Sequence, residues 1–246
     1  MPTLREIAEP IHAIFTTVLP VGDGICEVCH GAPNPGYPVC YSCRETTSQV
    51  TRPLSLVVPI SLSRVREQLH HVLWSYKNVT VPDLRLRFRA QVAATIGLFL
   101  AQHGDCIRGA ASREWDALTV VPSSGDRPGI HPLIETLRMI RHWNEELMDT
   151  LRKGPAPVGH TIADDAGFEV MQSVAGRSLL LVDDTLTSGA RLQSAASTLS
   201  LAGADVIAAV VVGRVINPDF NEASHQLWDR CRHVPYSFER CCLEES

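Results

Sequence analysis

Two adjacent carboxylates, Asp183 and Asp184, follow an apolar run in the segment LLLVDDTLTSG at residues 179–189. A short apolar run of this kind predicts a buried strand. Removing carboxylates from water is unfavourable unless a cation or a set of hydroxyl donors compensates. The pair therefore predicts that a ligand binds at the end of the strand.

The residues after the carboxylates offer hydroxyls and successive backbone N–H groups at the start of an expected helix. Such an arrangement can hold a phosphate dianion, and Gly189 allows a close approach of the backbone. Carboxylates beside it suit the hydroxyls of a sugar, so one ligand carrying both groups, a ribose 5-phosphate, explains the segment. The candidate binding residues are Asp183, Asp184, Thr185, Leu186, Thr187, Ser188, Gly189 and Ala190.

Four of the eight cysteines form two C-x2-C pairs, namely Cys26, Cys29, Cys40 and Cys43. Two such turns supply the four sulfur ligands of a closed, structural zinc site with no open position for catalysis. The loop between the pairs is rich in proline and glycine, so we expect the metal to fold it. The alternatives are free or redox-active cysteine pairs and, with less support, an iron–sulfur cluster.

The other four cysteines are Cys106, Cys231, Cys241 and Cys242. The last three lie in a C-terminal tail that also holds His225 and His233, so a second metal site is conceivable there. Their spacing matches no standard metal-binding template, and small buried thiols are common in protein cores. We therefore interpret them as core residues.

The composition is that of a globular protein: 246 residues, 45% of them apolar, with a formal net charge of -5. This charge argues against a surface that is basic throughout. No apolar run approaches the roughly 18 residues that span a bilayer, and Glu6 and Glu9 stand where a secretory signal would be basic and then apolar. We expect a cytoplasmic protein, in which many cysteines indicate metal binding rather than disulfides.

The elements that must position these residues change character near residue 50. Residues 1–50 are expected to form an N-terminal helix and the four-cysteine finger, and residues 51–246 a second domain with a C-terminal tail. Four apolar runs in this second part predict strands at 54–60, 116–121, 177–182 and 206–212.

Helical patterns separate these runs. One helix is expected over 63–77, a second begins at Pro82, and a third covers 133–151. The third shows an apolar stripe, interrupted by Asn144, at three- and four-residue spacings: Leu133, Leu137, Ile140, Asn144, Leu147 and Leu151. A fourth follows the carboxylates and ends at Gly203. Alternating strands and helices predict an α/β fold with a mostly parallel sheet, in which ligands bind at the carboxyl ends of the strands.

The segment VDDTLTSG resembles the PRPP-binding signature of type I phosphoribosyltransferases, where PRPP is phosphoribosyl diphosphate. The resemblance implies a Rossmann-like α/β domain in which Asp183 and Asp184 contact the ribose hydroxyls and residues 185–190 bind the 5-phosphate. It also implies a Mg2+ ion between diphosphate and sugar. The residues it assigns to the pyrophosphate loop are Pro122, Ser123 and Ser124.

Together with the four cysteines, the chain resembles the ComF-like proteins, which join a four-cysteine zinc finger to this domain. The likeness extends to VREQLHHVLWSYKNV at 65–79 and AGADVIAAVVVGR at 202–214. It implies a place in the uptake or processing of transforming DNA by competent bacteria, with single-stranded DNA and the uptake machinery as partners.

The chain departs from the family pattern at several positions. Thr187 stands where purine-using members carry an acid, and Arg191 where a threonine often ends the loop. The run RPGIHP at 127–132 replaces an RGFN-like run, and the stretch 153–170, where a hood is expected, is short. An active enzyme would displace pyrophosphate at the anomeric carbon, with Asp183 and Asp184 positioning the ribose, but the sequence indicates no general base and no acceptor.

The competing hypothesis is a non-catalytic protein that binds a nucleotide or single-stranded DNA without turnover. Basic residues gather between 64 and 89, interleaved with Trp74, Tyr76 and Phe88, and such a pattern suits single-stranded nucleic acid. The competing interpretation is that the aromatic residues belong to the core and the cations to a solvated face. The candidate nucleic-acid contacts are Arg64, Arg66, Lys77, Arg85, Arg87 and Arg89.

Overall fold

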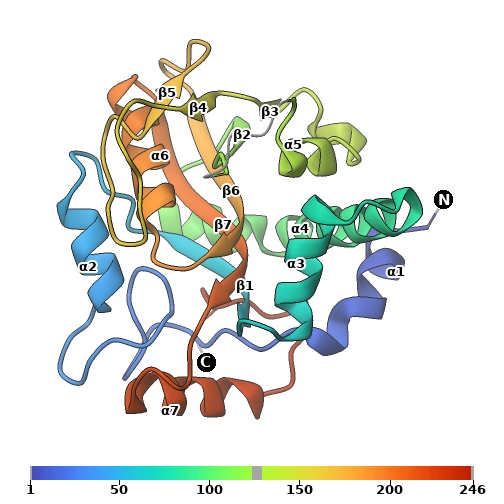
Figure 1. Cartoon of the computed structure of the whole chain (residues 1–246), viewed down its shortest axis with the longest axis vertical. Helices are drawn as coiled ribbons and strands as arrows, with labels where there is room; N and C mark the ends of the chain where they lie inside the picture. The colour runs from blue at the N-terminus through green and yellow to red at the C-terminus, as the bar shows by residue number, and fades with distance from the viewer. Residues whose placement is uncertain (1, 124–128, 245–246) are drawn as a thin grey trace.

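A five-stranded parallel sheet forms the centre of the computed structural model, which describes residues 2–123 and 129–244. The strand order is β1-β7-β6-β2-β3, and every neighbouring pair is parallel. The predicted class, α/β with a mostly parallel sheet and flanking helices, is confirmed (Figure 1). The strands are β1 (Val57–Ser63), β2 (Ala117–Val120), β3 (Leu147–Met148), β6 (Ser178–Leu186) and β7 (Asp205–Val215).

Helices connect these strands and cover both faces of the sheet. The chain passes through α3 (Gln68–Asn78) and α4 (Pro82–Ala111) before β2, and through α5 (Pro132–Leu137) and the 3-10 helix η2 (Arg141–Trp143) before β3. An antiparallel pair precedes β6, and α6 (Ala190–Leu201) joins β6 to β7. The remaining elements are α1 (Leu4–Ala8), η1 (Glu9–Ile14), α2 (Tyr41–Ser48), β4 (Leu151–Lys153), β5 (Phe168–Val170) and α7 (Glu222–Arg232).

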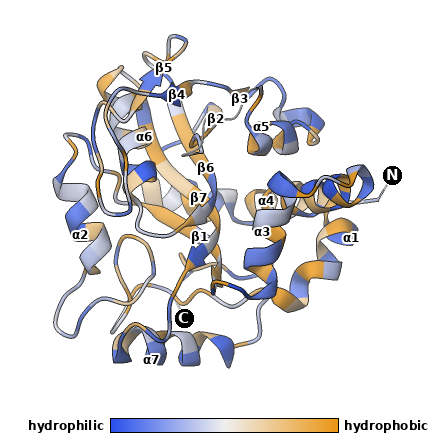
Figure 2. Ribbon diagram, viewed as in Figure 1, coloured by the Kyte–Doolittle hydropathy of each residue, from blue (hydrophilic) through white to orange (hydrophobic). Residues whose placement is uncertain are grey.

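The sheet separates two apolar cores because successive side chains of a strand point to opposite faces. In β6, Leu180 and Val182 pack in the core beneath α3 and α4, whereas Leu179 and Leu181 pack in the core beneath α6. Figure 1 shows α6 and α2 on one side of the sheet and α3 and α4 on the other, and Figure 2 shows the apolar character of β6 and β7. Both faces of the central strands are therefore buried, as parallel sheets require.

The predicted helix over 133–151 is wrong. The helix ends at Leu137, a 3-10 turn follows, and Leu147 and Met148 form an edge strand beside β2. Backbone hydrogen bonds along β2 take these two residues out of the helical register. Ile140 and Leu147 of the expected stripe are buried all the same, because successive turns of the chain bring both to the same core.

Three boundaries differ from those predicted. Strand β6 continues through Leu186 instead of ending at 182, since β7 pairs with it as far as Arg214. Strand β1 extends to Ser63, and α3 begins only at Gln68, after a turn in which Arg66 has a φ of 72°. The second helix begins at Pro82 as predicted, and Gly203, with a φ of 91°, follows the end of α6.

The N-terminal residues pack against the same core as α4. Ile11, Phe15 and Val18 are buried there, and Thr16 forms an isolated bridge with Leu62 of β1. A domain boundary near residue 50 remains a prediction. Within the described ranges, none of the helices has both the length and the apolar character needed to cross a membrane.

Candidate functional site

The strand order places the switch point of the sheet between β2 and β6. These strands are neighbours, but the chain leaves β2 towards β3 and leaves β6 towards β7 on the other side. In open parallel sheets, ligands bind at such a switch point, outside the carboxyl ends of the strands. The loops after β2 and β6 therefore both begin at this switch point.

Asp183 and Asp184 lie inside β6 and point to opposite faces of the sheet. Strand β2 has ended at this level, because its last pairing joins Val120 to Val182. Asp183 continues the face of Leu181 and lines a cavity at the start of α6, whereas Asp184 continues the face of Val182 towards α3. Both are buried, with 6% and 1% of their surface exposed. Two carboxylates that are adjacent in sequence thus have different surroundings.

Asp184 is held by two residues of α3. Its carboxylate accepts a hydrogen bond of 2.5 Å from the Tyr76 hydroxyl and forms an ion pair with the Lys77 ammonium. Burial alone would raise the pKa of Asp184, but the Lys77 charge and the hydrogen bonds from Lys77 and Tyr76 outweigh it and lower the pKa. Burial and the nearby Asp184 charge raise the pKa of Tyr76, so that the phenol stays a donor.

Asp183 has weaker compensation for its burial. Desolvation, and after it the charge of Asp184, raises the pKa of Asp183 to about 7, although Arg191 and Lys77 act in the opposite direction. Its Oδ1 accepts a hydrogen bond from the backbone N–H of Asp184 at 2.8 Å. A carboxylate in this state gains most from a cation or a hydroxyl donor that enters the cavity.

The N-terminus of α6 faces the same cavity. Gly189 precedes the helix with a φ of 89°, in the left-handed region that favours glycine. As a glycine, the cap residue has no side chain to offer, and the Ala190 N–H makes only a long hydrogen bond of 3.5 Å to the Ser188 hydroxyl. The first backbone N–H groups of a helix lack partners within it and, with the helix dipole, favour an anion. Residues 187–189 and the start of α6 therefore have the geometry expected of a phosphate-binding loop.

The cavity has a volume of about 340 Å³ and is closed on one side by the connection between β4 and β5. This size lies in the range of roughly 300–1,000 Å³ that is usual for ligand pockets. The residues that line it are Val158, Gly159, His160, Asp183, Thr185, Leu186, Thr187, Ser188, Gly189, Ala190, Arg191 and Leu192. The stretch where the sequence predicts a hood thus lies beside the predicted phosphate loop.

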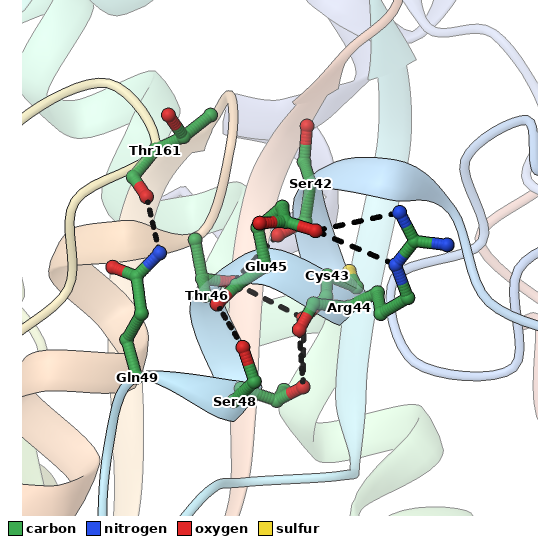
Figure 3. A network of polar contacts seen from close by, with 9 residues as sticks. Ser42, Cys43, Arg44, Glu45, Thr46, Ser48, Gln49 and Thr161 are labelled. Atoms are coloured by element: carbon green, nitrogen blue, oxygen red, sulfur yellow. Dashed lines mark hydrogen bonds and ion pairs between the residues drawn. The ribbon is translucent and has the colours of Figure 1, made fainter.

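Hydrogen bonds join the β4–β5 connection to Gln49, which follows α2, and to α6. Gln49, next to α2, donates to the Thr161 carbonyl at 3.1 Å, as Figure 3 shows, and accepts from the Ala163 N–H at 2.8 Å. Asp165 accepts a 2.5 Å hydrogen bond from Ser197 of α6. These contacts hold the connection over the cavity in a defined position.

The loop after β2 is described only in part. Pro122 and Ser123 are half-buried, and the Ser123 hydroxyl lies 2.6 Å from Nε2 of His131. Nδ1 of His131 accepts a hydrogen bond from the Leu133 N–H at the start of α5. Ser124, predicted with them as part of the pyrophosphate loop, and the first two residues of RPGIHP lie outside the described residues.

The four N-terminal cysteines converge as predicted. The sulfur atoms of Cys26, Cys29, Cys40 and Cys43 all lie within 4.8 Å of one another, and those of Cys29 and Cys40 are 3.7 Å apart. Zn–S bonds of about 2.3 Å in a tetrahedron give sulfur separations of roughly 3.8 Å. Hydrogen bonds with the other thiols, first that of Cys26, lower the pKa of Cys29 well below its usual value. The cluster can therefore hold a zinc ion.

Arg214 connects this cluster to the predicted phosphate loop. It lies buried on β7, where its Nε contacts the Cys29 sulfur at 3.3 Å. Its guanidinium also donates to the carbonyls of Thr187 at 2.5 Å and Leu186 at 3.3 Å. One side chain thus bonds to the finger and to the backbone of the loop at the same time.

Of the six predicted nucleic-acid contacts, three form ion pairs with acidic residues of the protein. Lys77 pairs with Asp184 in the sheet, Arg89 with Glu135 at 2.7 Å, and Arg64 with Asp219 at 2.8 Å. Of the aromatic residues between them, Tyr76 is buried and Phe88 partly so, but Trp74 is 54% exposed. The other three cations are the exposed Arg66 and Arg87 and the half-buried Arg85.

Sequence reasoning missed three residues of this region. Arg214 is a lone cation within an apolar run, and that isolation was a usable signal. Lys77 was assigned to a basic surface, although its neighbour Tyr76 lies on the buried face of the same helix. His160 gives no signal in the sequence, because only the folded connection brings it to the cavity.

Comparisons with known proteins add little to this geometry. The chain matches no protein-family model, and it has no significant sequence match to a curated protein. A solved structure to which it is similar is a purine phosphoribosyltransferase from Pyrococcus horikoshii Ot3, with 13% identity over 47% of this chain and 87% of that one and a TM-score of 0.24. A TM-score this low carries no weight for fold or function, which rest on the geometry described above.

Proposed function

We propose that this chain binds a ribose 5-phosphate ligand, with PRPP and Mg2+ as the first candidate, in the cavity between the start of α6 and the β4–β5 connection. The observation that carries the proposal is that a buried, weakly compensated carboxylate, Asp183, and the N-terminus of α6 line the same cavity. The first suits a hydroxyl or a cation and the second an anion. A sugar phosphate carries both groups at a fixed separation.

In this proposal each part of the cavity has its own task. Backbone N–H groups from Thr187 to Arg191 bind the phosphate, and the Arg191 charge adds to the helix dipole. Asp183 accepts hydrogen bonds from the ribose hydroxyls. Asp184 acts through α3, since Tyr76 and Lys77 hold it away from the cavity. Mg2+ bound with the diphosphate would offset part of the ligand's charge.

The type I phosphoribosyltransferase domain and the ComF-like arrangement belong to the same proposal. A transferase would break the bond between the anomeric carbon and the diphosphate while Asp183 positions the ribose. His160 at the cavity and Ser123 on the loop after β2 carry polar groups that can orient an acceptor or the leaving group. The acceptor itself follows from no residue of the site.

The proposal is tested by calorimetric titration of PRPP with Mg2+ into the wild-type protein and into Asp183→Asn. A hydrogen bond to a charged group contributes about 1.5–3 kcal/mol, so the variant should bind about 10- to 100-fold more weakly. Asp149→Asn, which removes a carboxylate outside the cavity, should bind like the wild type. Absence of binding by a folded wild-type protein at millimolar PRPP would refute the proposal.

A second candidate function is single-stranded DNA binding by the surface of α3 and α4. It is favoured by the exposure of Trp74, whose ring can stack on a base, close in sequence to the cations Arg66 and Arg87. The two arginines line a groove of about 570 Å³ together with His71, Leu84 and Phe88. Aromatic stacking next to phosphate contacts is the usual basis of sequence-independent binding.

Fluorescence anisotropy with a labelled oligonucleotide tests this candidate. Trp74→Ala should weaken binding by about 1–3 kcal/mol, and Arg66→Ala/Arg87→Ala should reduce the salt dependence by about one phosphate contact for each arginine. Arg152→Ala, which removes an exposed cation on β4, serves as the matched control. Equal affinity and salt dependence in all these proteins would exclude this surface.

A further inference from the structure

A second group of metal-binding side chains lies on the other side of the sheet from the four-cysteine cluster. His103 and Cys106 come from one turn of α4, and Cys241 and Glu244 from the C-terminal tail. One ligand atom from each lies within 4.8 Å of all the others. Both pairs have the x2 spacing of the N-terminal cysteines, but more than a hundred residues separate them. Only the fold brings them together.

The distances within this group match those of a metal coordination shell. His103 Nδ1 lies 3.3 Å from a Glu244 carboxylate oxygen and 3.9 Å from the Cys106 sulfur, and that sulfur lies 3.9 Å from the same oxygen. Zinc bonds of about 2.0–2.3 Å in a tetrahedron give separations of roughly 3.3–3.8 Å between ligand atoms. The separations are long for direct hydrogen bonds but suitable for atoms around a shared ion.

The hydrogen bonding of His103 prepares it as a ligand. Its Nε2 donates to the Phe238 carbonyl at 2.7 Å, which places the ring proton on Nε2 and leaves the lone pair of Nδ1 directed at the group. Metal-binding histidines almost always make such a bond through their second nitrogen. The ring also packs against Phe99, with centroids 4.8 Å apart, and is buried. Its orientation is therefore fixed without a metal.

The group combines burial with a path for an ion. His103 and Cys241 are buried, whereas Cys106 is half-buried and the Glu244 side chain is 39% exposed. Two sulfurs, one nitrogen and one oxygen form a donor set of intermediate softness, which suits Zn2+ better than Mg2+ or Ca2+. All four positions are supplied by side chains, so the shell is closed and structural in type.

We propose that His103, Cys106, Cys241 and Glu244 form a second zinc site, which fastens the C-terminal tail to α4. The tail packs its aromatic residues on the N-terminal segment: Tyr236 and Phe238 lie 5.0 and 5.7 Å from Phe15 between ring centroids. A metal ion at this position links Cys241 and Glu244 of the tail to α4. The inference is independent of the ribose phosphate proposal.

Zinc stoichiometry tests the site directly. The full-length protein, reduced and equilibrated with Zn2+, is freed of loosely bound ions on a desalting column and analysed by mass spectrometry for metal and protein. We expect two zinc ions per chain in the wild type, one in Cys106→Ser/Cys241→Ser, and two in the control Cys242→Ala, which changes a neighbouring thiol outside the group. Equal zinc content in the wild type and the double variant would overturn the proposal.

A second variant keeps the test decisive if the cysteine variant does not fold. Glu244→Gln changes a partly exposed side chain and should lower the affinity for one of the two zinc ions at least 10-fold, measured in competition with a chromogenic chelator. Even the loss of a residue that only supports a metal ligand costs about 10-fold or more in metal affinity. An unchanged titration contradicts the site. A disulfide between Cys106 and Cys241 in protein purified under reducing conditions would also contradict it, because the thiolates would be consumed.

Discussion

The two faces of strand β6 give two chemically identical residues, Asp183 and Asp184, different surroundings. On the α6 face, Asp183 meets a cavity, a helix N-terminus and a loop that Arg214 holds against the four-cysteine cluster. On the α3 face, the Lys77 ammonium compensates the charge of Asp184, and the Tyr76 hydroxyl donates a hydrogen bond to it. The difference follows from the two-residue period of a strand. Adjacent carboxylates can therefore have separate functions, one in binding a ligand and the other in holding the fold.

Removing the metal from the four-cysteine cluster should have the largest effect, and it should affect mainly the α6 face. Structural zinc contributes roughly 10–16 kcal/mol to the folding of zinc-finger peptides, so Cys29→Ser/Cys43→Ser should lose at least about 5 kcal/mol of stability in residues 20–50. Because Arg214 then loses its sulfur contact, hydrogen exchange should also rise at 187–189.

The comparison predicts that α4 keeps its protection in the same experiment. Cys231→Ser, which changes a buried cysteine of the other core, is the matched control and should leave exchange at 187–189 unchanged. Uniform loss of protection on both faces would show that the cluster does not act on the loop through Arg214. Unchanged folding after complete chelation would refute a structural zinc site.

Asp184→Asn should cause the next largest effect, on stability. The substitution leaves the Lys77 charge without its partner in a largely buried position, which should destabilise the protein by about 2 kcal/mol. Urea denaturation measures the loss. Lys77→Met/Asp184→Asn should recover part of it, since no unpaired charge remains. A double variant less stable by the sum of both single losses would argue against the pair.

Asp183→Asn should have an effect of opposite sign on stability, and this effect should depend on pH. The pKa of Asp183 rises from its usual 3.8 to about 7 in the folded state, so the folded protein binds more protons between these values. Stability should therefore fall as pH rises from about 4 towards 7, with a slope of at most about 1.4 kcal/mol per pH unit.

Asparagine has no such titration, so the variant should match the wild type near pH 4 and be more stable than it near pH 8. Thermal melts across this range, with the ligand absent, measure the difference. Parallel stability curves for the two proteins would mean that burial does not raise the pKa of Asp183. The binding proposal would then lose one of its supports.

Gly189→Ala should give the smallest effect. Its φ of 89° disfavours a side chain, whereas the nearest heavy atom would lie 3.7 Å from the added Cβ, so the loss of about 1 kcal/mol comes from the backbone alone. Gly109→Ala, within α4, should instead stabilise by up to about 1 kcal/mol. A loss beyond about 3 kcal/mol for Gly189→Ala would indicate packing that the structure lacks.

Sequence reasoning succeeded where the signal is local. The C-x2-C pairs predict their cluster because each pair folds as one turn, and Pro82 marks a helix start. It failed where tertiary contacts determine the secondary structure. Leu147 fits a helical pattern but pairs with β2 as part of strand β3, and pairing with β7 extends β6 beyond residue 182. Had β6 been predicted to run through Leu186, its alternation would have separated Asp183 from Asp184. The His103 group is undetectable in sequence, since its halves meet only through the tail.

The most direct test of the central claim compares PRPP binding with folding stability in Asp183→Asn and Asp184→Asn. At matched folded fractions and pH 8, Asp183→Asn should lose about 10- to 100-fold in affinity and none of its stability. Asp184→Asn should lose stability and retain most of its affinity. If both variants lose the same affinity at unchanged stability, the two carboxylates act together on the ligand and the division between the faces of β6 is wrong.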